Sequence, residues 1–330
     1  MDSAFSTEHF YTDCRQCPRE CGVNRTEKKG GFCGETDEVR AALACLHFGE
    51  EPPITVTGGS GTLFITGCTL RCAFCQNYQI SQGSYGKTLS SNDFTSICLT
   101  LQDSGAENIN IVTGSHCIPR LAEYIYHAQQ KGCEIPFCWN SSAYESIETL
   151  RLLKPLVKIW LPDFKTTSQT LSKNLFGAED YPFIAKEAIL WMIENYPLKI
   201  ERKKDGKEKM LEGVIVRHLF LPGHFDDTAE VLLWLKKNAD SRAYISLMNQ
   251  YTPVHFKEDK KNYEKRMKSL SSLENRLVCE EEDADLRDLI DIYNFQNLFY
   301  QELNSDTSWL PDFTAKQPFP NALSKTVWHC

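Results

Sequence analysis

Short β-rich runs alternate with helical patterns between residues 62 and 247, and this alternation constrains the fold more than any other feature. Six runs rich in β-branched and aromatic residues are typical of strands: 62–66, 108–113, 134–139, 156–161, 213–220 and 243–247. Helical periodicity separates them over 91–103, 119–130, 144–153, 169–176 with 182–196, and 227–237. Strands that alternate with helices form parallel sheets with right-handed crossovers. We therefore predict an α/β fold with a parallel sheet.

The two ends of the chain differ in composition from this middle part. We predict three regions: a cysteine-rich extension over 1–61, a core over 62–256, and a C-terminal region over 257–330. In the last region, 257–282 is charge-rich and predicted to be helical, and an amphipathic face follows at Leu286, Leu289, Ile290 and Tyr293. Residues 309–320 contain too many prolines for regular structure, and their aromatic residues indicate a strap that packs over the core.

Charge and hydropathy exclude several classes of protein. The net charge of −8 argues against a general nucleic-acid binder, which needs a basic face. The charged run 199–209 is mixed in sign and centred on Asp205-Gly206, so we interpret it as a solvated hairpin or loop rather than a nucleic-acid contact. We expect no membrane partner, because no run of 18 apolar residues occurs, and the start of the sequence is not typical of a signal peptide. A cytoplasmic location is expected.

Three cysteines in one short loop carry the strongest functional signal. Cys68, Cys72 and Cys75 follow the first predicted strand as C-x3-C-x2-C. Thiolates are soft ligands suited to iron–sulfur clusters, and a [4Fe–4S] cluster held for electron transfer takes four of them. Three ligands leave one iron open to an external ligand. The alternative is structural zinc, but zinc requires a closed tetrahedral shell, and no fourth ligand follows at finger-like spacing.

A second cysteine group lies near the start of the chain. Cys14, Cys17, Cys21 and Cys33 form C-x2-C-x3-C-x11-C with nearby glycines that permit tight turns. Four thiols close a shell, so a structural Zn²⁺ site is the simplest interpretation, an auxiliary iron–sulfur cluster is the second, and reduced metal-free thiols are the third. The chain has 14 cysteines, and the seven outside the two groups are more typical of small core residues.

Polar residues follow four of the predicted strands, where functional side chains collect in a parallel barrel. Thr113 and Gly114 end the second strand and Asn140 and Ser141 end the third. Asp163 and Lys165 follow the fourth, and Arg217 lies in the fifth. The planar guanidinium of Arg217 is suited to pairing with a carboxylate. We predict that these residues are functional and lie together near the cysteine loop.

The cysteine loop, with Phe74 before its third cysteine, resembles the signature of the radical S-adenosylmethionine (SAM) enzymes. These enzymes fold as partial (β/α)6 TIM-like barrels, so the resemblance implies such a barrel. In this chain we expect the barrel to carry the N-terminal cysteine-rich metal-binding extension and the C-terminal strap predicted above. Asp163 with Lys165, and Arg217 with Pro222-Gly223, resemble elements of glycyl-radical-activating enzymes. The chain also resembles the radical SAM subgroup of pyruvate formate-lyase-activating-enzyme homologues, on the cysteine loop with Gln76–Tyr78, Cys17–Arg25, Gly31–Gly34, Arg217–Gly223 and Leu310–Phe313.

This resemblance implies cofactors, chemistry and partners. A [4Fe–4S] cluster on Cys68, Cys72 and Cys75 would bind SAM, with Phe74 beside the adenine. Asp163 and Lys165 would lie beside SAM, and Arg217 would pair with the SAM carboxylate. Backbone carbonyls of Thr113 and Gly114 would bind the SAM amino group, and Asn140 and Ser141 would complete the cofactor site. An electron donor of the flavodoxin or ferredoxin type would reduce the cluster. SAM would then yield a 5′-deoxyadenosyl radical, which abstracts hydrogen from a glycine of a partner glycyl radical enzyme. The alternatives are radical modification of a small molecule or peptide, and a non-catalytic metal scaffold that binds a partner.

Overall fold

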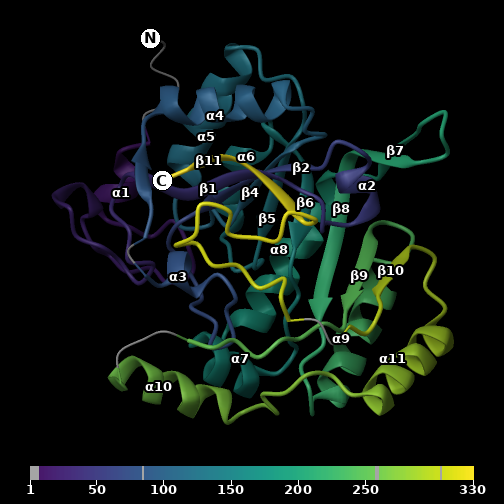
Figure 1. Ribbon diagram of the computed structural model, residues 1–330. Coiled ribbons are helices and arrows are strands. Elements are labelled where there is room, and N and C mark those ends of the chain that lie inside the picture. The colour runs from purple at the N-terminus through teal and green to yellow at the C-terminus, as the bar shows by residue number, and fades with distance from the viewer. Residues whose placement is uncertain (1–6, 84, 257–259, 305–306) are drawn as a thin grey trace.

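In the computed structural model, which describes residues 7–83, 85–256, 260–304 and 307–330, one sheet with an open parallel core dominates the fold (Figure 1). Its strands are β1 (Val39–His47), β2 (Ser60–Ile65), β3 (Lys87–Leu89), β4 (Ile109–Val112), β5 (Phe137–Ser141), β6 (Val157–Pro162), β7 (Lys199–Arg202), β8 (Glu208–Leu219), β9 (Tyr244–Met248), β10 (Leu298–Gln301) and β11 (Ser324–His329). Along the sheet the order is β10-β9-β8-β6-β5-β4-β2-β1-β11. The pairs from β2 to β10 are parallel, which confirms the predicted partial barrel.

All six predicted core strands are present, as β2, β4, β5, β6, β8 and β9. The charged run 199–209 is a hairpin, since β7 pairs antiparallel with the start of β8. The sheet is wider than predicted, because β10 adds a further parallel strand beside β9. On the opposite edge β1 pairs antiparallel with both β2 and β11. Both flanking regions of the sequence therefore contribute strands to the main sheet, and the proposed division at residues 61 and 256 stays a prediction.

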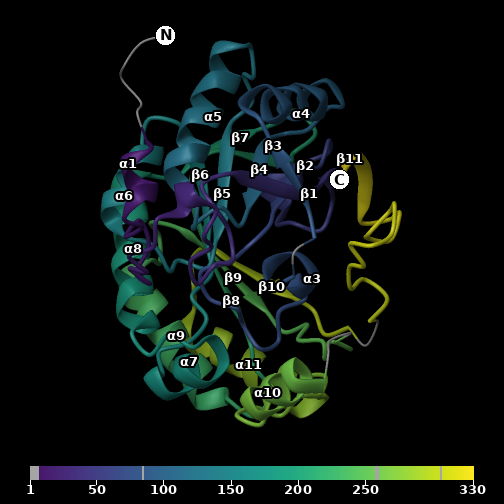
Figure 2. The ribbon, with the colours of Figure 1, turned by 90° about the vertical axis from the view of Figure 1, so that its left-hand side faces the viewer.

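Helices cover the outer face of the sheet (Figure 2). The described elements are α1 (His9–Thr12), η2 (Arg25–Glu27), α2 (Pro52–Thr55), α3 (Tyr78–Ser81), α4 (Ser91–Asp103), α5 (Ile118–Gln130), α6 (Ile147–Leu153), α7 (Gln169–Phe176), α8 (Tyr181–Asn195), α9 (Phe225–Asn238), α10 (Lys260–Leu270) and α11 (Glu280–Tyr293). The predicted continuous helix over 257–282 is wrong. Residues 257–259 lie outside the described part, α10 ends at Leu270, and α11 begins only at Glu280.

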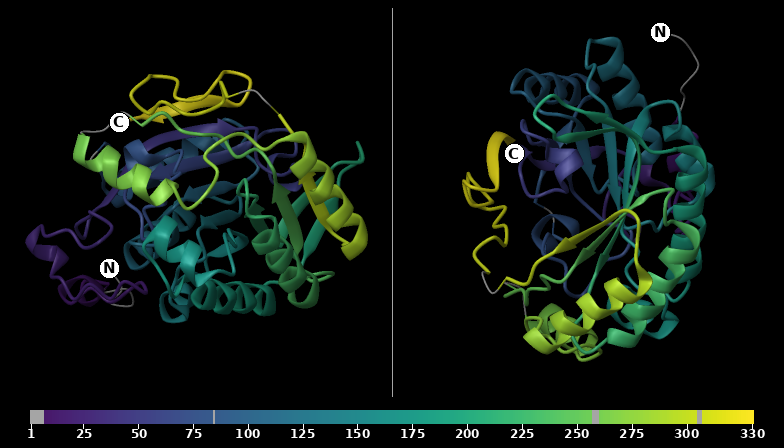
Figure 3. Two further views of the ribbon diagram at one scale, coloured as in Figure 1. Left: turned by 90° about the horizontal axis from the view of Figure 1, so that it is seen from below. Right: turned by 90° about the vertical axis from the view of Figure 1, so that its right-hand side faces the viewer.

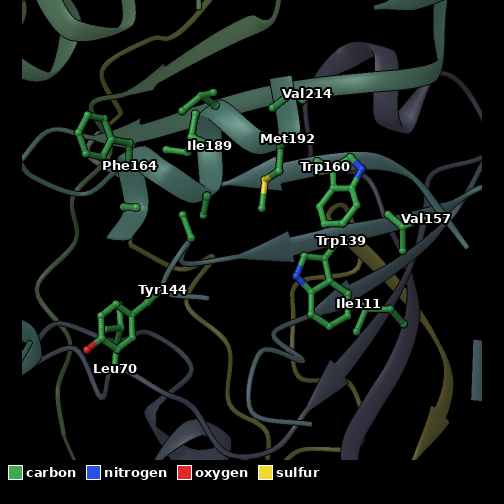
Figure 4. Packing of buried hydrophobic residues seen from close by; sticks show 14 of the residues in the cluster. Leu70, Ile111, Trp139, Tyr144, Val157, Trp160, Phe164, Ile189, Met192 and Val214 are labelled. Atoms are coloured by element: carbon green, nitrogen blue, oxygen red, sulfur yellow. The ribbon is translucent and has the colours of Figure 1, made fainter. Parts of the chain in front are cut away.

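The main core lies between the sheet and these helices (Figure 4). Trp139 of β5 and Trp160 of β6 are fully buried, and Trp160 meets Trp191 of α8 edge to face at 5.8 Å between ring centroids. Met192 of α8 packs in the same cluster. Apolar burial on this scale stabilises the parallel strands, whose carboxyl ends can then carry polar groups. Among the described residues, no helix is long and apolar enough to cross a membrane.

The proline-rich strap crosses the open side of the curved sheet, opposite the helices (Figure 3). Residues 309–320 form neither helix nor strand, as predicted, and then lead into β11. Phe313 and Phe319 are buried in a second apolar cluster with Phe64 of β2 and Leu43 of β1. The Phe313 and Phe64 rings are 5.4 Å apart. The strap therefore packs on the face of β1 and β2 opposite the helix-covered core.

Phe313→Ala should destabilise the protein by about 3–5 kcal/mol, because a fully buried phenyl ring is removed. Chemical denaturation followed by circular dichroism measures this change. Phe183→Ala is the matched control, since the Phe183 side chain is 61% exposed. Equal effects of the two substitutions would contradict the packed strap.

Candidate radical SAM site

Cys68, Cys72 and Cys75 lie in the loop between β2 and α3, at the carboxyl end of a core strand. All three thiols are free and partly buried. Burial raises the pKa of Cys72, while the charge of Lys165 acts in the opposite direction. Burial also raises the pKa of Cys75, which has the Ser81 hydroxyl 3.3 Å from its sulfur. A bound metal would favour the thiolate forms of Cys72 and Cys75. Three soft donors from one loop fit a [4Fe–4S] cluster with one open iron.

Contacts from distant parts of the chain hold this loop. Arg266 of α10 donates to the Ala73 carbonyl at 3.1 Å and to the Gln82 side chain at 2.9 Å. Gln82 in turn donates to the Cys72 carbonyl at 3.1 Å. The Ala73 amide donates to the Leu175 carbonyl at the end of α7. The loop backbone is thus fixed independently of any metal, so the thiols start from a restricted set of positions.

Asp163, Lys165 and Arg217 form one ionic network beside the loop. The Asp163 carboxylate accepts from Lys165 Nζ at 2.7 Å and from Arg217 Nε at 3.1 Å. Burial alone would raise the pKa of Asp163, but the two cations outweigh it and hold the pKa below its usual range. Tyr181 fixes the backbone here, since its hydroxyl donates to the Asp163 carbonyl and accepts from the Lys165 amide. The structure therefore brings these three predicted residues together.

Glu50 was not predicted as a site residue, and it extends this ionic network by pairing with Arg217. Its side chain accepts from Arg217 at 3.0 Å and from Asn110 at 3.1 Å. Burial raises the pKa of Glu50 despite the opposing charge of Arg217. Arg217 also donates to Asn140, so its guanidinium already has three protein partners. The only sequence signal for Glu50 is a pair of carboxylates before Pro52-Pro53, which does not show that the segment enters the barrel.

The other predicted cofactor residues lie nearby but have protein partners of their own. A Cβ on Gly114 would lie 2.4 Å from Leu121 and 2.6 Å from Trp139, so close packing by itself requires this glycine. Thr113 directly follows β4 and is partly exposed. Ser141 donates to the buried Glu145 at 2.8 Å. Phe74 packs edge to face against Phe176 and Tyr251. Their roles toward SAM stay predictions.

Glu145 is a second missed residue and joins two strand ends. Its carboxylate accepts from Ser115 at 2.7 Å, from Trp139 at 2.6 Å and from Ser141 at 2.8 Å. Burial raises its pKa, and the three hydrogen bonds act in the opposite direction. The side chain therefore links the loop after β4 to the end of β5, the two places where the sequence predicts SAM contacts. No local sequence pattern distinguishes this glutamate from a surface residue.

The N-terminal cysteines lie next to the same loop. Cys14, Cys17, Cys21 and Cys33 line a single small cavity, which Thr69 of the C-x3-C-x2-C loop also lines. Arg19 donates to the Thr69 carbonyl at 2.7 Å. The two predicted cysteine groups are therefore neighbours in the fold, although the chain separates them by more than 30 residues.

The radical SAM superfamily matches residues 62–235, more than half of the chain. A Methanocaldococcus jannaschii protein described as "uncharacterized protein MJ0674" is 30% identical over 300 residues, which make up 88% of this chain and 78% of that protein. The chain therefore belongs to the radical SAM superfamily. Membership implies an enzyme that uses a [4Fe–4S] cluster and SAM.

Solved structures of three proteins are similar to parts of this chain. SAM-bound SuiB of Streptococcus suis is 13% identical with a TM-score of 0.46, and the match covers 71% of this chain and 48% of SuiB. A domain of pyruvate-formate lyase-activating enzyme from Bacteroides vulgatus is 12% identical with a TM-score of 0.36, over 56% of this chain and 91% of that domain. The hydrogenase maturase HydG of Carboxydothermus hydrogenoformans is 14% identical with a TM-score of 0.41, and the match covers 71% of this chain and 56% of HydG. This chain spans about half the length of SuiB and HydG.

Stability should fall on acidification because His47 is held neutral next to the network. Burial and the charge of Arg217 lower the pKa of His47 from 6.5 to about 4, and its Nδ1 accepts from the Gly49 amide. Below pH 6.5 the unfolded chain therefore binds a proton that the folded protein does not. Through His47, the free energy of unfolding should fall by about 1–2 kcal/mol as the pH falls from about 6.5 to about 4. Urea denaturation across this range should show a shallower pH slope for His47→Gln. An unchanged slope would contradict the buried neutral imidazole.

Proposed function

We propose that Cys68, Cys72 and Cys75 hold the [4Fe–4S] cluster and that Lys165 and Asp163 bind SAM beside it. The observation that carries this proposal is the pair of Lys165 and Asp163, which are 2.7 Å apart just after β6. Lys165 is only 18% exposed. Burial raises the pKa of Cys72 and the charge of Lys165 acts in the opposite direction, which accords with a position of the ammonium beside the cysteine loop. A partly dehydrated ammonium next to the open iron can pair with the SAM carboxylate.

Arg217 has a supporting role in this proposal. Its side chain bridges Asp163 and Glu50, so it fixes the carboxylate that orients Lys165. The family resemblance implies that Arg217 pairs with the SAM carboxylate, whereas the three protein partners of Arg217 favour Lys165 for this task. Asn140 then positions Arg217, and Thr113 and Gly114 offer backbone carbonyls to the SAM amino group.

The bound cluster and SAM supply reductive formation of a 5′-deoxyadenosyl radical, which abstracts a hydrogen atom from the substrate. The protein side chains bind SAM, exclude water and position one substrate hydrogen. A glycine of a partner glycyl radical enzyme is the first candidate, on the motif resemblance, with a flavodoxin- or ferredoxin-type donor as the source of the electron. No nucleic-acid or membrane partner is proposed, and a cytoplasmic location accords with this electron supply. Cys14, Cys17, Cys21 and Cys33 form a separate candidate site for zinc or an auxiliary cluster.

The strap favours a second candidate, a small molecule or a short peptide. Phe313 and Phe319 pack on the face of β1 and β2 that lines the barrel interior. The strap also contacts the segment that follows the cluster loop, where Gln79 of α3 donates to Asp312 at 2.9 Å and accepts from the Phe313 amide. A loop of a folded partner protein would have to displace these contacts before it reached the site.

Reconstituted, reduced protein should convert SAM to 5′-deoxyadenosine and methionine, measured by liquid chromatography. Cys72→Ala should abolish the product because the cluster loses a ligand. Cys279→Ala is the control, since Cys279 is exposed and lies outside both cysteine groups. A protein with a full cluster that forms no 5′-deoxyadenosine would overturn the enzymatic proposal and support a scaffold.

Lys165→Met should weaken SAM binding more than Arg217→Met weakens it, by about tenfold or more for the lost charge-assisted pair. Equilibrium dialysis with labelled SAM measures both variants. Lys173→Met is the matched control, because Lys173 pairs with Glu179 on the surface and is 62% exposed. Stronger weakening by Arg217→Met would restore the assignment made from sequence.

The substrate class can be tested by comparing the wild type with a variant in which the strap has lost its two buried phenyl rings. Phe313→Ala together with Phe319→Ala should leave turnover of a small substrate unchanged or lower. If the substrate is instead a glycine on a partner protein, the same variant should raise the yield of organic radical on that protein, scored by electron paramagnetic resonance. The two outcomes separate the two candidates.

A further inference from the structure

The four N-terminal cysteines line one small cavity together with two arginines and a histidine. The cavity between them has a volume of about 10 Å³. Besides the cysteines, its lining includes Arg19, Arg25, Phe32, Thr69 and His116. Two glycines after cysteines, Gly22 and Gly34, have φ of 63° and 84°. This left-handed conformation lets each turn bend back behind its cysteine.

Several N–H groups point at the sulfur atoms. The Phe32 amide donates to Cys21 Sγ at 3.3 Å. The side chains of Gln16 and Arg25 each donate to Cys14 Sγ at 3.6 Å. Donors placed around a sulfur favour the thiolate over the thiol, as in the outer shell of a metal site.

Arg25 is a buried cation without a carboxylate partner among the described residues. Its side chain is 1% exposed, and its guanidinium donates to the carbonyls of Thr36 and His116. A charge buried this deeply needs a compensating charge. The Cys14 sulfur, which accepts from the Arg25 guanidinium at 3.6 Å, is the nearest group that could carry this charge as a metal-bound thiolate. Four thiolates and one divalent ion leave a net charge of about −2, which Arg25 and Arg19 can balance.

His116 supplies an independent indication of a ligand. It is 2% exposed, it lines the same cavity, and its Nδ1 has no hydrogen-bond partner among the described residues. A buried ring nitrogen without a partner is costly in a protein interior, which indicates that a polar or charged group occupies this cavity.

The number of thiols at the cavity is suited to a single ion. Four cysteines line one cavity, which is enough to close a tetrahedral shell around zinc without a further ligand. In the described ranges, no three His, Cys, Asp or Glu side chains lie at metal-binding spacing, so the thiols have to move inward to bind the ion.

We propose that Cys14, Cys17, Cys21 and Cys33 bind one zinc ion. The ion holds Arg19 in a position from which its side chain stabilises the loop of Cys68, Cys72 and Cys75, and we call this the bracing role of Arg19. Arg19 lies in the turn between Cys17 and Cys21. It donates to the Thr69 carbonyl at 2.7 Å and to the carbonyls of Phe176 and Gly177 at the end of α7, at 3.1 and 2.5 Å. Its guanidinium stacks on Phe32 at 3.8 Å. Zinc fixes the turn, and the turn fixes Arg19 on the loop.

Metal analysis of protein isolated without oxygen tests the zinc site, independently of the radical SAM cluster. A variant with Cys68, Cys72 and Cys75 all changed to Ala should keep about one zinc per chain and no iron. Adding Cys14→Ala and Cys33→Ala should remove the zinc, whereas Cys279→Ser should not. Iron retained by the triple variant would overturn the proposal in favour of an auxiliary cluster.

Cobalt substitution provides a second readout if the triple variant does not fold. In the wild-type chain, cobalt at this site should give the absorption spectrum of a tetrahedral tetrathiolate. A wild-type protein that contains no zinc, or cobalt bound by oxygen and nitrogen ligands only, would overturn the proposal.

The bracing role rests on the cluster assignment proposed above and has its own test. Arg19→Gln should keep the zinc but lose iron to a chelator about tenfold faster than the wild type, since second-shell partners contribute at this level. Arg15→Gln is the matched control, because Arg15 lies in the same segment but pairs with Asp13 on the surface. Iron loss at the wild-type rate in Arg19→Gln would refute the bracing role and leave the zinc site standing.

Discussion

The Asp163 carboxylate lies between two cations, Lys165 and Arg217, and the rest of the site is arranged around this interaction. A single buried charge is costly, but a chain of alternating charges is less so. Glu50 ends the chain by accepting from Arg217. Glu50 follows β1, Asp163 and Lys165 follow β6, and Arg217 lies in β8. The network therefore links three parts of the barrel that are distant in the sequence.

The cysteine loop depends on contacts from outside the barrel as well. Arg19 holds it from the N-terminal cysteine segment, and Arg266 holds it from α10. Gln79 of α3 joins the segment that follows the loop to the strap. Neither arginine lies within the segment that matches the superfamily, residues 62–235. Most of the barrel and all three thiols lie within the segment that matches the superfamily. The regions before and after that segment provide the contacts that hold the cysteine loop and the strap that covers the sheet.

The sequence predicts the parts of this structure whose signal is local. β-branched runs identified β2, β4, β5, β6, β8 and β9, and the strand-end rule brought Asp163, Lys165 and Arg217 together. β1 was missed because Val39–His47 contains four alanines and leucines in a row and lacks alternation, since both of its faces are buried. Its strand conformation comes from pairing with β2 and β11. Glu50, Glu145 and Arg266 were missed because their burial depends on long-range packing.

The central claim is that three thiolates leave one iron free to bind SAM next to Lys165. Electron–nuclear double resonance on the reduced protein, with SAM isotopically labelled in its amino and carboxylate groups, tests this claim most directly. We predict hyperfine coupling from both labels to the cluster, and loss of the carboxylate coupling or a change in it in Lys165→Met. A cluster signal that labelled SAM leaves unchanged would contradict the account.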